Sequence, residues 1–208
     1  MFVDRKDAGE KLASRMNVSP NEQIVVIGLA RGGIVIAKAI GDRLSCPFDI
    51  LVVKKLTLPI EPELAIGAVA PDSVSVVNHR LAQQLGADSS QIQEQISDKS
   101  KDINRQENVY RKARSYIKVK RKTVIIADDG AATGATMEVS IKWMKKKSAR
   151  KIIVAIPVAP KDVVEQFKKM VDDVVVLETP EDFQAVGQFY TDFKQVEDEE
   201  VVRVMRGK

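Results

Sequence analysis

The sequence predicts an α/β fold, a doubly wound and mainly parallel sheet flanked by helices. Short apolar runs typical of buried parallel strands alternate with stretches of helical spacing. The strand-like runs cover residues 23–28, 48–53, 124–127, 151–158 and 173–177, and the helical stretches cover residues 34–44, 137–147 and 161–171. Strand–helix–strand units of this kind give right-handed crossovers. With 208 residues, 44% of them hydrophobic, one domain can bury a sizeable core.

Composition and charge narrow the class of protein. No apolar run approaches the length of a membrane span, and no apolar segment of a signal peptide follows residues 1–6. The single cysteine, Cys46, cannot form an internal disulfide, so the expected compartment is a reducing cytoplasm. The net charge of +4 and the pI of about 9.1 are compatible with anionic substrates and are modest evidence for nucleic acid.

Four segments lie outside the alternating core. Residues 4–16 carry apolar side chains at helical spacing and predict an N-terminal helix. Residues 58–62 contain two prolines and predict an irregular loop, and residues 64–77 predict a hairpin around Pro71 and Asp72. Residues 89–115 are polar with a narrow apolar stripe, which predicts a long, partly exposed helix. His79 and Cys46 receive no role.

The most informative stretch is residues 124–136, which read Val-Ile-Ile-Ala-Asp-Asp-Gly-Ala-Ala-Thr-Gly-Ala-Thr. An apolar strand here runs into a tight turn and a helix start. Glycines allow a close backbone approach, and the helix N-terminus offers unpaired N–H groups, so a phosphate fits the turn. The predicted phosphate-binding residues are Gly130, Ala131, Ala132, Thr133, Gly134, Ala135 and Thr136. The adjacent acids Asp128 and Asp129 repel one another, so burying them brings no benefit unless hydroxyls or a cation share the site.

Two better-known phosphate motifs do not match. A P-loop requires lysine directly after its last glycine, and here Ala135 follows Gly134. A dinucleotide-binding loop requires Gly-x-Gly-x-x-Gly, and Gly28, Gly32 and Gly33 have a different spacing.

The remaining pattern, a hydrophobic strand, two acids and a turn ending Thr-Gly-x-Thr, resembles the phosphoribosyl pyrophosphate signature of type I phosphoribosyltransferases. A second stretch, with Ala30, Arg31, Gly32 and Gly33 between a strand and a helix, resembles the pyrophosphate-binding loop of the same family. In that family a non-proline cis peptide in this loop aims N–H groups at pyrophosphate, and the resemblance places it between Ala30 and Arg31.

Lys54 and Lys55 follow the strand predicted at 48–53, at the sheet edge where ligands of open α/β sheets bind. Their predicted partner is pyrophosphate, and a solvated pair on a loop stays an open alternative. Residues 111–122 carry seven basic residues and no acid. This run is either a solvated face, a lid over the active site, a dimer contact or an RNA-binding patch. In the family a mobile segment falls in this part of the chain, within residues 56–117.

The tail, residues 178–193, is rich in aromatic residues and has little periodicity. It can be a C-terminal core plug, but it resembles the Pro-x-x-Phe hood of hypoxanthine-type phosphoribosyltransferases, in which the aromatic ring stacks on the base. That ring corresponds to Phe183. We expect a single domain over residues 1–208, with a core of about 20–178, a charged helical insertion of about 88–118 and a hood of about 179–208.

The resemblance is greatest to the small bacterial and archaeal phosphoribosyltransferases of unassigned base. It implies transfer of the phosphoribosyl group to a nitrogen acceptor, a nucleobase, with release of pyrophosphate, and thus a role in nucleotide salvage as a homodimer. Asp128 and Asp129 would be catalytic and would accept from the ribose hydroxyls. Mg²⁺ would be held by substrate and water near these acids, with no direct protein cage. The alternative is a non-catalytic regulator that senses phosphoribosyl pyrophosphate and binds nucleic acid.

One position departs from the family pattern. Hypoxanthine- and guanine-type relatives place an Asp where this chain has Ala132, and a methyl group cannot move a proton. The end of the strand at 151–158 also lacks the lysine that reads a six-oxo group, because Lys161 comes slightly too late. We therefore expect poor use of hypoxanthine and guanine, with Glu61 or Glu63 of the mobile segment, or an acceptor that is already deprotonated, replacing the missing acid.

Overall fold

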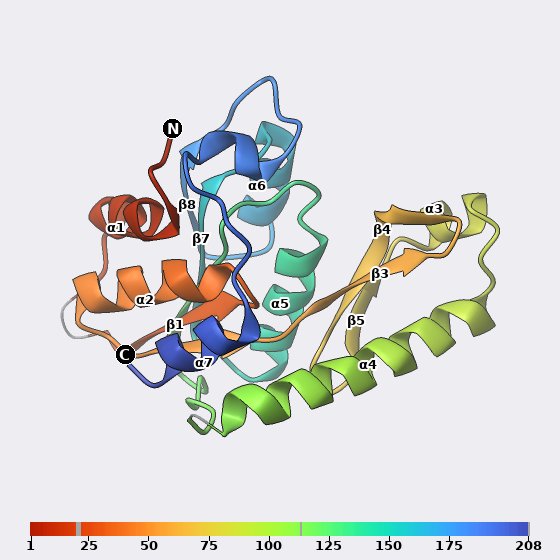
Figure 1. Cartoon of the computed structure of the whole chain (residues 1–208), viewed down its shortest axis with the longest axis horizontal. Helices are drawn as coiled ribbons and strands as arrows, with labels where there is room; N and C mark the ends of the chain where they lie inside the picture. Colours follow the sequence, from red (N-terminus) through yellow and green to blue (C-terminus); the bar gives the residue numbers. More distant parts are fainter. Residues whose placement is uncertain (20–21, 113, 208) are drawn as a thin grey trace.

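The computed structural model describes residues 1–19, 22–112 and 114–207, with only the backbone of residues 62 and 63. Its main sheet has five strands in the order β2-β1-β6-β7-β8, and every neighbouring pair is parallel (Figure 1). The strands are β1 (Ile24–Leu29), β2 (Phe48–Leu51), β6 (Thr123–Ala127), β7 (Lys151–Val158) and β8 (Asp173–Glu178). This confirms the predicted doubly wound sheet. The strand order reverses between β1 and β6, which is where ligands of such sheets bind.

Helices cover both faces of this sheet because its strands are apolar on both sides. In β6, Ile125 and Ala127 belong to one core cluster, whereas Val124 and Ile126 belong to the other. The first face is covered by α1 (Arg5–Arg15), α2 (Gly33–Leu44) and α7 (Asp198–Met205), and the second by α5 (Ala135–Lys146) and α6 (Lys161–Lys168) (Figure 1). The core thus consists of two apolar layers with the sheet between them.

A second, antiparallel sheet stands beside the first, in the order β3-β4-β5 (Figure 1). It consists of β3 (Lys54–Leu58), β4 (Glu61–Ala70) and β5 (Val74–Val77). The hairpin predicted around Pro71 and Asp72 is confirmed. The irregular loop predicted at 58–62 is wrong, because β3 turns into β4 at residues 59–60 and pairs with it from Lys54 to Leu58. The strand predicted at 48–53 ends two residues early, at Leu51.

After α3 (His79–Gln84), the long helix α4 (Ser89–Arg111) runs from the second sheet back to the first (Figure 1). It begins with a capping box between Asp88 and Gln91. Its buried side chains include Ile92, Ile96, Ile103 and Tyr110, which confirms the narrow apolar stripe. The helix ends at Arg111, short of the predicted residue 115. No helix in the described ranges is long and apolar enough to cross a bilayer.

The two sheets meet where the β4–β5 turn packs against α5. The indole Nε1 of Trp143 donates a hydrogen bond to Oδ2 of Asp72 at 3.2 Å. Lys147 approaches the same oxygen at 2.8 Å, and its ammonium lies 5.0 Å from the centre of the indole ring. Asp72 therefore ties the turn of the second sheet to the helix that follows the Asp-Asp motif.

The tail runs beside the start of the chain. The backbone N–H of Phe2 donates to the carbonyl of Phe189 at 2.7 Å, and the N–H of Thr191 donates to the carbonyl of Phe2 at 2.8 Å. The rings of Phe2 and Tyr190 lie 5.3 Å apart. These contacts bring the first residues of α1 and the tail together near the carboxyl edge of the main sheet.

Candidate functional site

The two sequence motifs meet at the carboxyl edge of the main sheet because β1 and β6 are neighbours. A Cβ atom on Gly32 would stand 2.1 Å from Oδ2 of Asp129, and a Cβ on Gly33 would stand 2.6 Å from the carbonyl oxygen of Ala127. Real side chains do not approach so closely, so the loop after β1 requires glycine to lie against the loop after β6. The structure thus joins residues 30–33 and 128–136 into one site.

The loop after β1 has the backbone that the resemblance implies, since the peptide bond between Ala30 and Arg31 is cis. The side chain of Arg31 points toward the first turn of α7. Its Nη1 donates to Oε2 of Glu197 at 3.1 Å and lies 3.8 Å from Oδ1 of Asp198. The same Asp198 oxygen accepts from the hydroxyl of Tyr110 on α4 at 2.6 Å. The predicted pyrophosphate arginine is therefore held by acids of the terminal helix.

Asp128 and Asp129 are both half-buried, and each has one carboxylate oxygen engaged. Oδ1 of Asp128 accepts from the backbone N–H of Asp129 at 3.0 Å, and Oδ2 of Asp129 accepts from Nε of Arg5 at 2.8 Å. The hydroxyl of Tyr190 also donates to the backbone carbonyl of Asp129 at 2.7 Å. Among the described residues, no group hydrogen-bonds Oδ2 of Asp128 or Oδ1 of Asp129, and neither atom is fully enclosed. The pair therefore offers two free acceptor oxygens.

The electrostatics of the pair follow from burial and proximity. Burial raises the pKa of Asp128 well above its ordinary value, and the charge of Asp129 raises it further. Burial also raises the pKa of Asp129, while the guanidinium of Arg5 opposes that rise. Arg5 and Lys55 act on the pKa of Asp128 in the same opposing direction. Two carboxylates in this setting favour a ligand that brings hydroxyl donors or a cation.

The turn after the acids leads directly into α5, whose N-cap is Gly134 with φ 77°. No side chain caps this helix, so its first N–H groups remain available to an anion. Ala132 and Thr133 are exposed at the turn.

Glycine is required at positions 130 and 134 for a different reason from the one that the sequence predicts. The sequence predicts that they leave room for a ligand. A Cβ on Gly130 would instead stand 2.7 Å from Val186 of the tail, and a Cβ on Gly134 would stand 2.9 Å from the ring of Phe167 on α6. Both glycines therefore allow the turn to pack against protein.

Lys54 and Lys55 begin β3 and do not end β2, but their charges still act at the site. Lys54 is half-buried, and burial lowers its pKa while the charges of Asp102 and Asp198 oppose that change. Arg31 is close enough to lower this pKa further. Lys55 is exposed, and its charge acts on Asp128.

The tail contributes the predicted base-stacking residue. Phe183 is partly buried and stacks on Phe189, with ring centres 5.6 Å apart and planes 25° apart. Val186 lies between these two rings in sequence and packs onto Gly130. The tail therefore lies beside the turn that the sequence predicts to bind phosphate, which is where a hood is expected.

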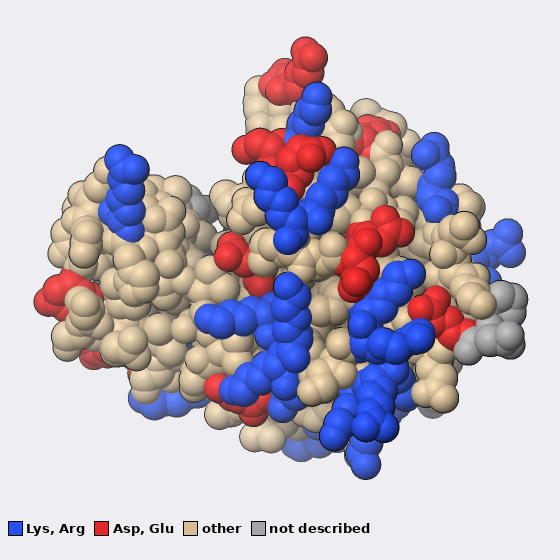
Figure 2. Space-filling view, turned by 180° about the vertical axis from the view of Figure 1, so that it is seen from behind, with Lys and Arg blue, Asp and Glu red and all other residues tan. Residues whose placement is uncertain are grey.

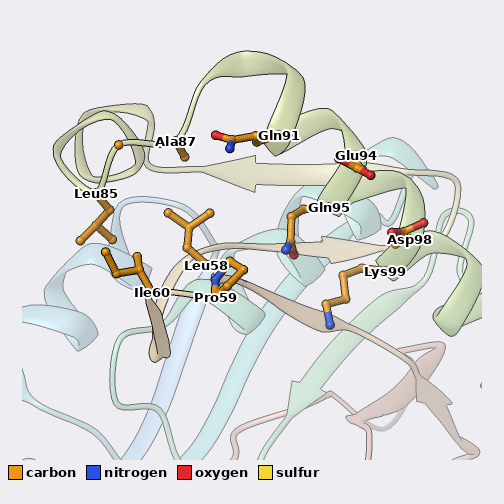
Figure 3. A pocket seen from close by; sticks show the side chains of 11 residues that line it. Leu58, Pro59, Ile60, Leu85, Ala87, Gln91, Glu94, Gln95, Asp98 and Lys99 are labelled. Carbon is orange, nitrogen blue, oxygen red and sulfur yellow. The ribbon is translucent and has the colours of Figure 1, made fainter.

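The two glutamates considered for proton transfer are placed differently by the fold. Glu61 is exposed at the start of β4, paired with Leu58 in the β3–β4 hairpin. The side chain of Glu63 lies outside the described residues. Near that hairpin turn a hollow of about 560 Å³ opens toward α4 (Figure 3), between Leu58, Pro59 and Ile60 on one side and Gln91, Glu94, Gln95, Asp98 and Lys99 on the other. None of its lining residues belongs to the predicted site.

The basic run at 111–122 is partly structural. Nη1 of Arg111 lies 2.6 Å from Oδ1 of the buried Asp49, and its Nε lies 2.9 Å from Oε2 of Glu107. Arg114 donates to the backbone carbonyl of Phe48. These two arginines fasten the end of α4 to β2. Lys112, Lys118 and Lys120 are exposed, and Lys and Arg side chains gather in the lower part of the face in Figure 2.

Arg5 and Tyr190 contact the acid pair, and the sequence did not predict either. Arg5 stands at the first position of a helix whose pattern indicates only a packed apolar face, and Tyr190 is one of several rings in the tail. No local pattern connects either residue with Asp129.

The acid pair has the chemistry of a partial metal site. Within the described residues, no group of three or more His, Cys, Asp or Glu side chains is arranged to hold a metal ion. Two neighbouring carboxylates with free oxygens suit a hard cation that keeps most of its waters. They fit Mg²⁺ bound mainly by substrate.

Comparisons with known proteins agree with this geometry. The family model "Phosphoribosyl transferase domain" matches residues 3–194. Two curated sequences of Mycobacterium tuberculosis, including "Putative phosphoribosyl transferase Rv0571c", are 38% identical over 202 residues, which is 97% of this chain and 46% of theirs. The chain thus spans about half the length of the curated relatives that it matches.

Solved structures show the same fold. The protein TT1426 from Thermus thermophilus is 35% identical, with a TM-score of 0.84 over 99% of this chain and 98% of that one. A purine phosphoribosyltransferase from Pyrococcus horikoshii shares the fold at 20% identity, with a TM-score of 0.50 over 95% and 97% of the two chains. With two matching loops at one sheet edge and a family model over nearly its whole length, the chain belongs to the phosphoribosyl transferase domain family.

Proposed function

We propose that this protein is a phosphoribosyltransferase that moves the phosphoribosyl group of phosphoribosyl pyrophosphate to a ring nitrogen of a nucleobase and releases pyrophosphate. The observation that carries the proposal is the pair of free oxygens, Oδ2 of Asp128 and Oδ1 of Asp129, beside two loops suited to phosphates. Two acceptors at one sheet edge match the two neighbouring hydroxyls of a ribose.

Asp128 and Asp129 act on the sugar. Each accepts from one ribose hydroxyl through its free oxygen. When the bond to pyrophosphate lengthens, positive charge develops on the sugar ring, and the negative field of the two carboxylates stabilises it. Because the pair is half-buried, this field is less screened than it would be in water.

The phosphates bind on either side of the acids. The N–H groups of residues 131–136 and the hydroxyls of Thr133 and Thr136 bind the 5′-phosphate at the start of α5. The loop at 30–33, with Arg31, Lys54 and Lys55, binds the pyrophosphate and stabilises the charge that it gains on leaving. Mg²⁺, held near Asp128 and Asp129 by substrate and water, would supply charge neutralisation for the pyrophosphate.

The acceptor lies under the hood, with Phe183 against its ring. Because Ala132 cannot move a proton, we propose that the acceptor is neither hypoxanthine nor guanine. The proton is handled by a residue of segment 56–117, with Glu61 and Glu63 as the candidates, or the acceptor is already deprotonated. We also propose that the protein works in nucleotide salvage as a homodimer in the cytoplasm, the compartment that its single cysteine suits.

A nucleic-acid-binding sensor is not favoured as the second candidate. Arg111 and Arg114 of the basic run are engaged by Asp49, Glu107 and the backbone of β2, which leaves a smaller basic surface. Arg31 and both lysines of the pyrophosphate side are also present, and a sensor could dispense with them.

The test is a panel of nucleobases incubated with phosphoribosyl pyrophosphate and Mg²⁺, with nucleotide product and pyrophosphate measured for each base. We expect one or a few bases to give nucleotide and expect hypoxanthine and guanine to be at least about tenfold poorer in kcat/KM, since acid–base help is worth about 10²–10⁴ in rate. If hypoxanthine or guanine is the best acceptor, the interpretation of Ala132 is wrong.

The matched variant is the double substitution Asp128→Asn with Asp129→Asn, which should abolish transfer while the circular dichroism spectrum stays unchanged. Its control is Asp172→Asn with Asp173→Asn. That second Asp-Asp pair lies at the start of β8, at the opposite end of the parallel strands. Asp172 accepts from the backbone N–H of Ile152, and Asp173 accepts from the backbone N–H of Val174. The control should keep full turnover. Turnover in the first variant would contradict the assignment of Asp128 and Asp129.

A further inference from the structure

Arg5 joins three separate parts of the molecule. It is the first residue of α1, and its Nε donates to Oδ2 of Asp129 at 2.8 Å across 124 positions of sequence. Its Nη1 donates to the backbone carbonyl of Lys194 at 2.7 Å, and its guanidinium lies 4.0 Å from the ring centre of Phe193. The side chains of Arg5 and Asp129 are only 11% and 17% exposed. Such a pair, with a stacked guanidinium, has one well-defined geometry.

This geometry determines which oxygen of Asp129 is presented. Because Oδ2 accepts from Arg5, the carboxylate cannot rotate without losing that hydrogen bond, and Tyr190 holds the backbone carbonyl of the same residue. Gly32 packs against the same oxygen, and a Cβ there would also stand 2.7 Å from Nε of Arg5. Oδ1 of Asp129 is therefore the oxygen left to a ligand.

The contact also has an electrostatic consequence. Asp128 and Asp129 stand side by side at a half-buried position, where two negative charges repel one another. The positive charge of Arg5 lies against Oδ2 of Asp129, so it offsets this repulsion and leaves Oδ1 of Asp129 and Oδ2 of Asp128 without a hydrogen bond from it.

We propose that Arg5 is a positioning residue for phosphoribosyl transfer, which turns Oδ1 of Asp129 toward the ribose and fixes residues 190–194 of the tail against the acid pair. The inference rests on the function proposed above. Arg5 acts through Asp129 and the tail and has no role in binding pyrophosphate, which distinguishes it from Arg31.

The experiment compares Arg5→Ala, Arg5→Lys and Lys6→Ala in the transfer assay, with the acceptor that the base panel identifies for the wild-type protein. Arg5→Ala should lower kcat about 10–100-fold, the range for losing a group that orients a reacting side chain. Its KM for phosphoribosyl pyrophosphate should change less than about threefold, because the phosphate and pyrophosphate loops are intact. Arg5→Lys keeps the positive charge but lacks the planar guanidinium, so its kcat should lie between those of Arg5→Ala and the wild type.

Two further readouts separate positioning from a loss of structure. Guanidinium ions added at millimolar concentration should restore part of the activity of Arg5→Ala, because the ion can occupy the vacated contact. Lys6→Ala removes an exposed positive charge one residue away, which has only a weak contact with Glu10 at 3.9 Å, and should match the wild type with and without guanidinium. If Arg5→Ala does not fold, Arg5→Lys is measured in its place, and a larger effect on kcat than on KM for phosphoribosyl pyrophosphate supports the inference.

The outcomes are distinct. A kcat of Arg5→Ala within twofold of the wild type overturns the inference and leaves the proposed function standing. A larger effect on KM than on kcat also overturns it, because Arg5 would then bind substrate directly. A wild-type protein that forms no nucleotide with any base overturns the proposed function, and this inference with it.

Discussion

Asp128 and Asp129 are identical side chains at adjacent positions, yet their surroundings differ. Asp129 has the guanidinium of Arg5 against one oxygen, whereas Asp128 has a single backbone N–H. The ionised form of Asp128 is therefore the less well compensated of the two. We therefore expect Asp128 to lower the stability of the folded protein while serving the proposed activity.

That imbalance gives a prediction about pH. The unfolded chain ionises Asp128 at its ordinary pKa, whereas burial raises the pKa in the folded protein. The ionised carboxylate therefore costs stability at pH 7, and this cost disappears as the pH falls through the raised pKa toward the ordinary one. Asp128→Asn should raise the free energy of unfolding at pH 7 by roughly 0.5–2 kcal/mol. The gain should shrink near pH 4, about the ordinary pKa of Asp.

Urea unfolding without Mg²⁺ at the two pH values measures this difference. Asp162→Asn, which changes an exposed acid on α6, should show no such gain. A gain that grows on acidification would contradict the account of Asp128.

Gly32 gives a second prediction at the scale of one residue. Its φ of −61° suits alanine, so Gly32→Ala puts no strain on the backbone. The new methyl group would collide with Oδ2 of Asp129 and Nε of Arg5 and displace both. We expect kcat/KM to fall at least about tenfold, since a small misplacement of reacting groups costs up to about 10².

Its control is Gly86→Ala. Gly86 has φ 79°, so alanine there is strained, but a Cβ would have no neighbour within 4 Å in the described chain. This variant should lose stability and keep its kcat/KM. A fully active Gly32→Ala would mean that the loop after β1 can move away from Asp129.

At the scale of elements, α4 is fastened to β2 through one buried acid. Asp49 is 1% exposed and accepts from Nη1 of Arg111 and from the backbone N–H of Ile117. Asp49→Ala removes the nearer of the two carboxylates that pair with Arg111. We expect a loss of about 3–5 kcal/mol in the free energy of unfolding, as for other broken buried pairs. Asp98→Ala, which removes an exposed partner of Lys101 on the same helix, should leave the denaturation midpoint unchanged. Equal losses in both variants would show that the buried position of Asp49 is not what matters.

The elements that the sequence predicted are those with a local signal. Four aliphatic residues before Asp128 predict β6, and the apolar stripe of residues 89–115 predicts most of α4. The β3–β4 hairpin was missed because Lys54 and Lys55 are charged and two prolines follow, so the segment has the composition of a loop. Its strands are specified by pairing with each other and by packing under α4, which no short window of sequence records.

The residues of the candidate site also fall into those with a local sequence signal and those without one. The acids and the Arg31 loop are recognisable because each is a contiguous motif, and the parallel order of β1 and β6 then brings them together. Arg5 and Tyr190 are not recognisable, since each depends on a contact between distant parts of the chain. Sequence alone therefore predicts the groups that we propose bind ligand, and it does not predict the distant residues that contact them.

For the molecule as a whole, Arg31 joins α7 to the loop that we propose binds pyrophosphate. Glu197 accepts from Nη1 of Arg31, so on the proposed function its carboxylate competes with pyrophosphate for this nitrogen of the guanidinium. Glu197→Gln should tighten pyrophosphate binding up to about fivefold, the scale of an exposed pair. Titration calorimetry measures the change, with Glu199→Gln in the same turn of α7 as the control. Weaker binding in Glu197→Gln would mean that Glu197 helps to present Arg31 to the ligand.

The contact between the two sheets has a spectroscopic consequence. Trp143 is the only tryptophan of the chain, and its Nε1 donates to Asp72 in the turn of the second sheet. Its emission therefore comes from one indole placed where the β4–β5 turn meets α5, and not from an average over the molecule. Separation of the turn from α5 would expose the indole to water and shift its emission to longer wavelength. Asp72→Ala should produce that shift in the folded protein, so unlabelled protein can report by fluorescence whether ligand binding moves the second sheet.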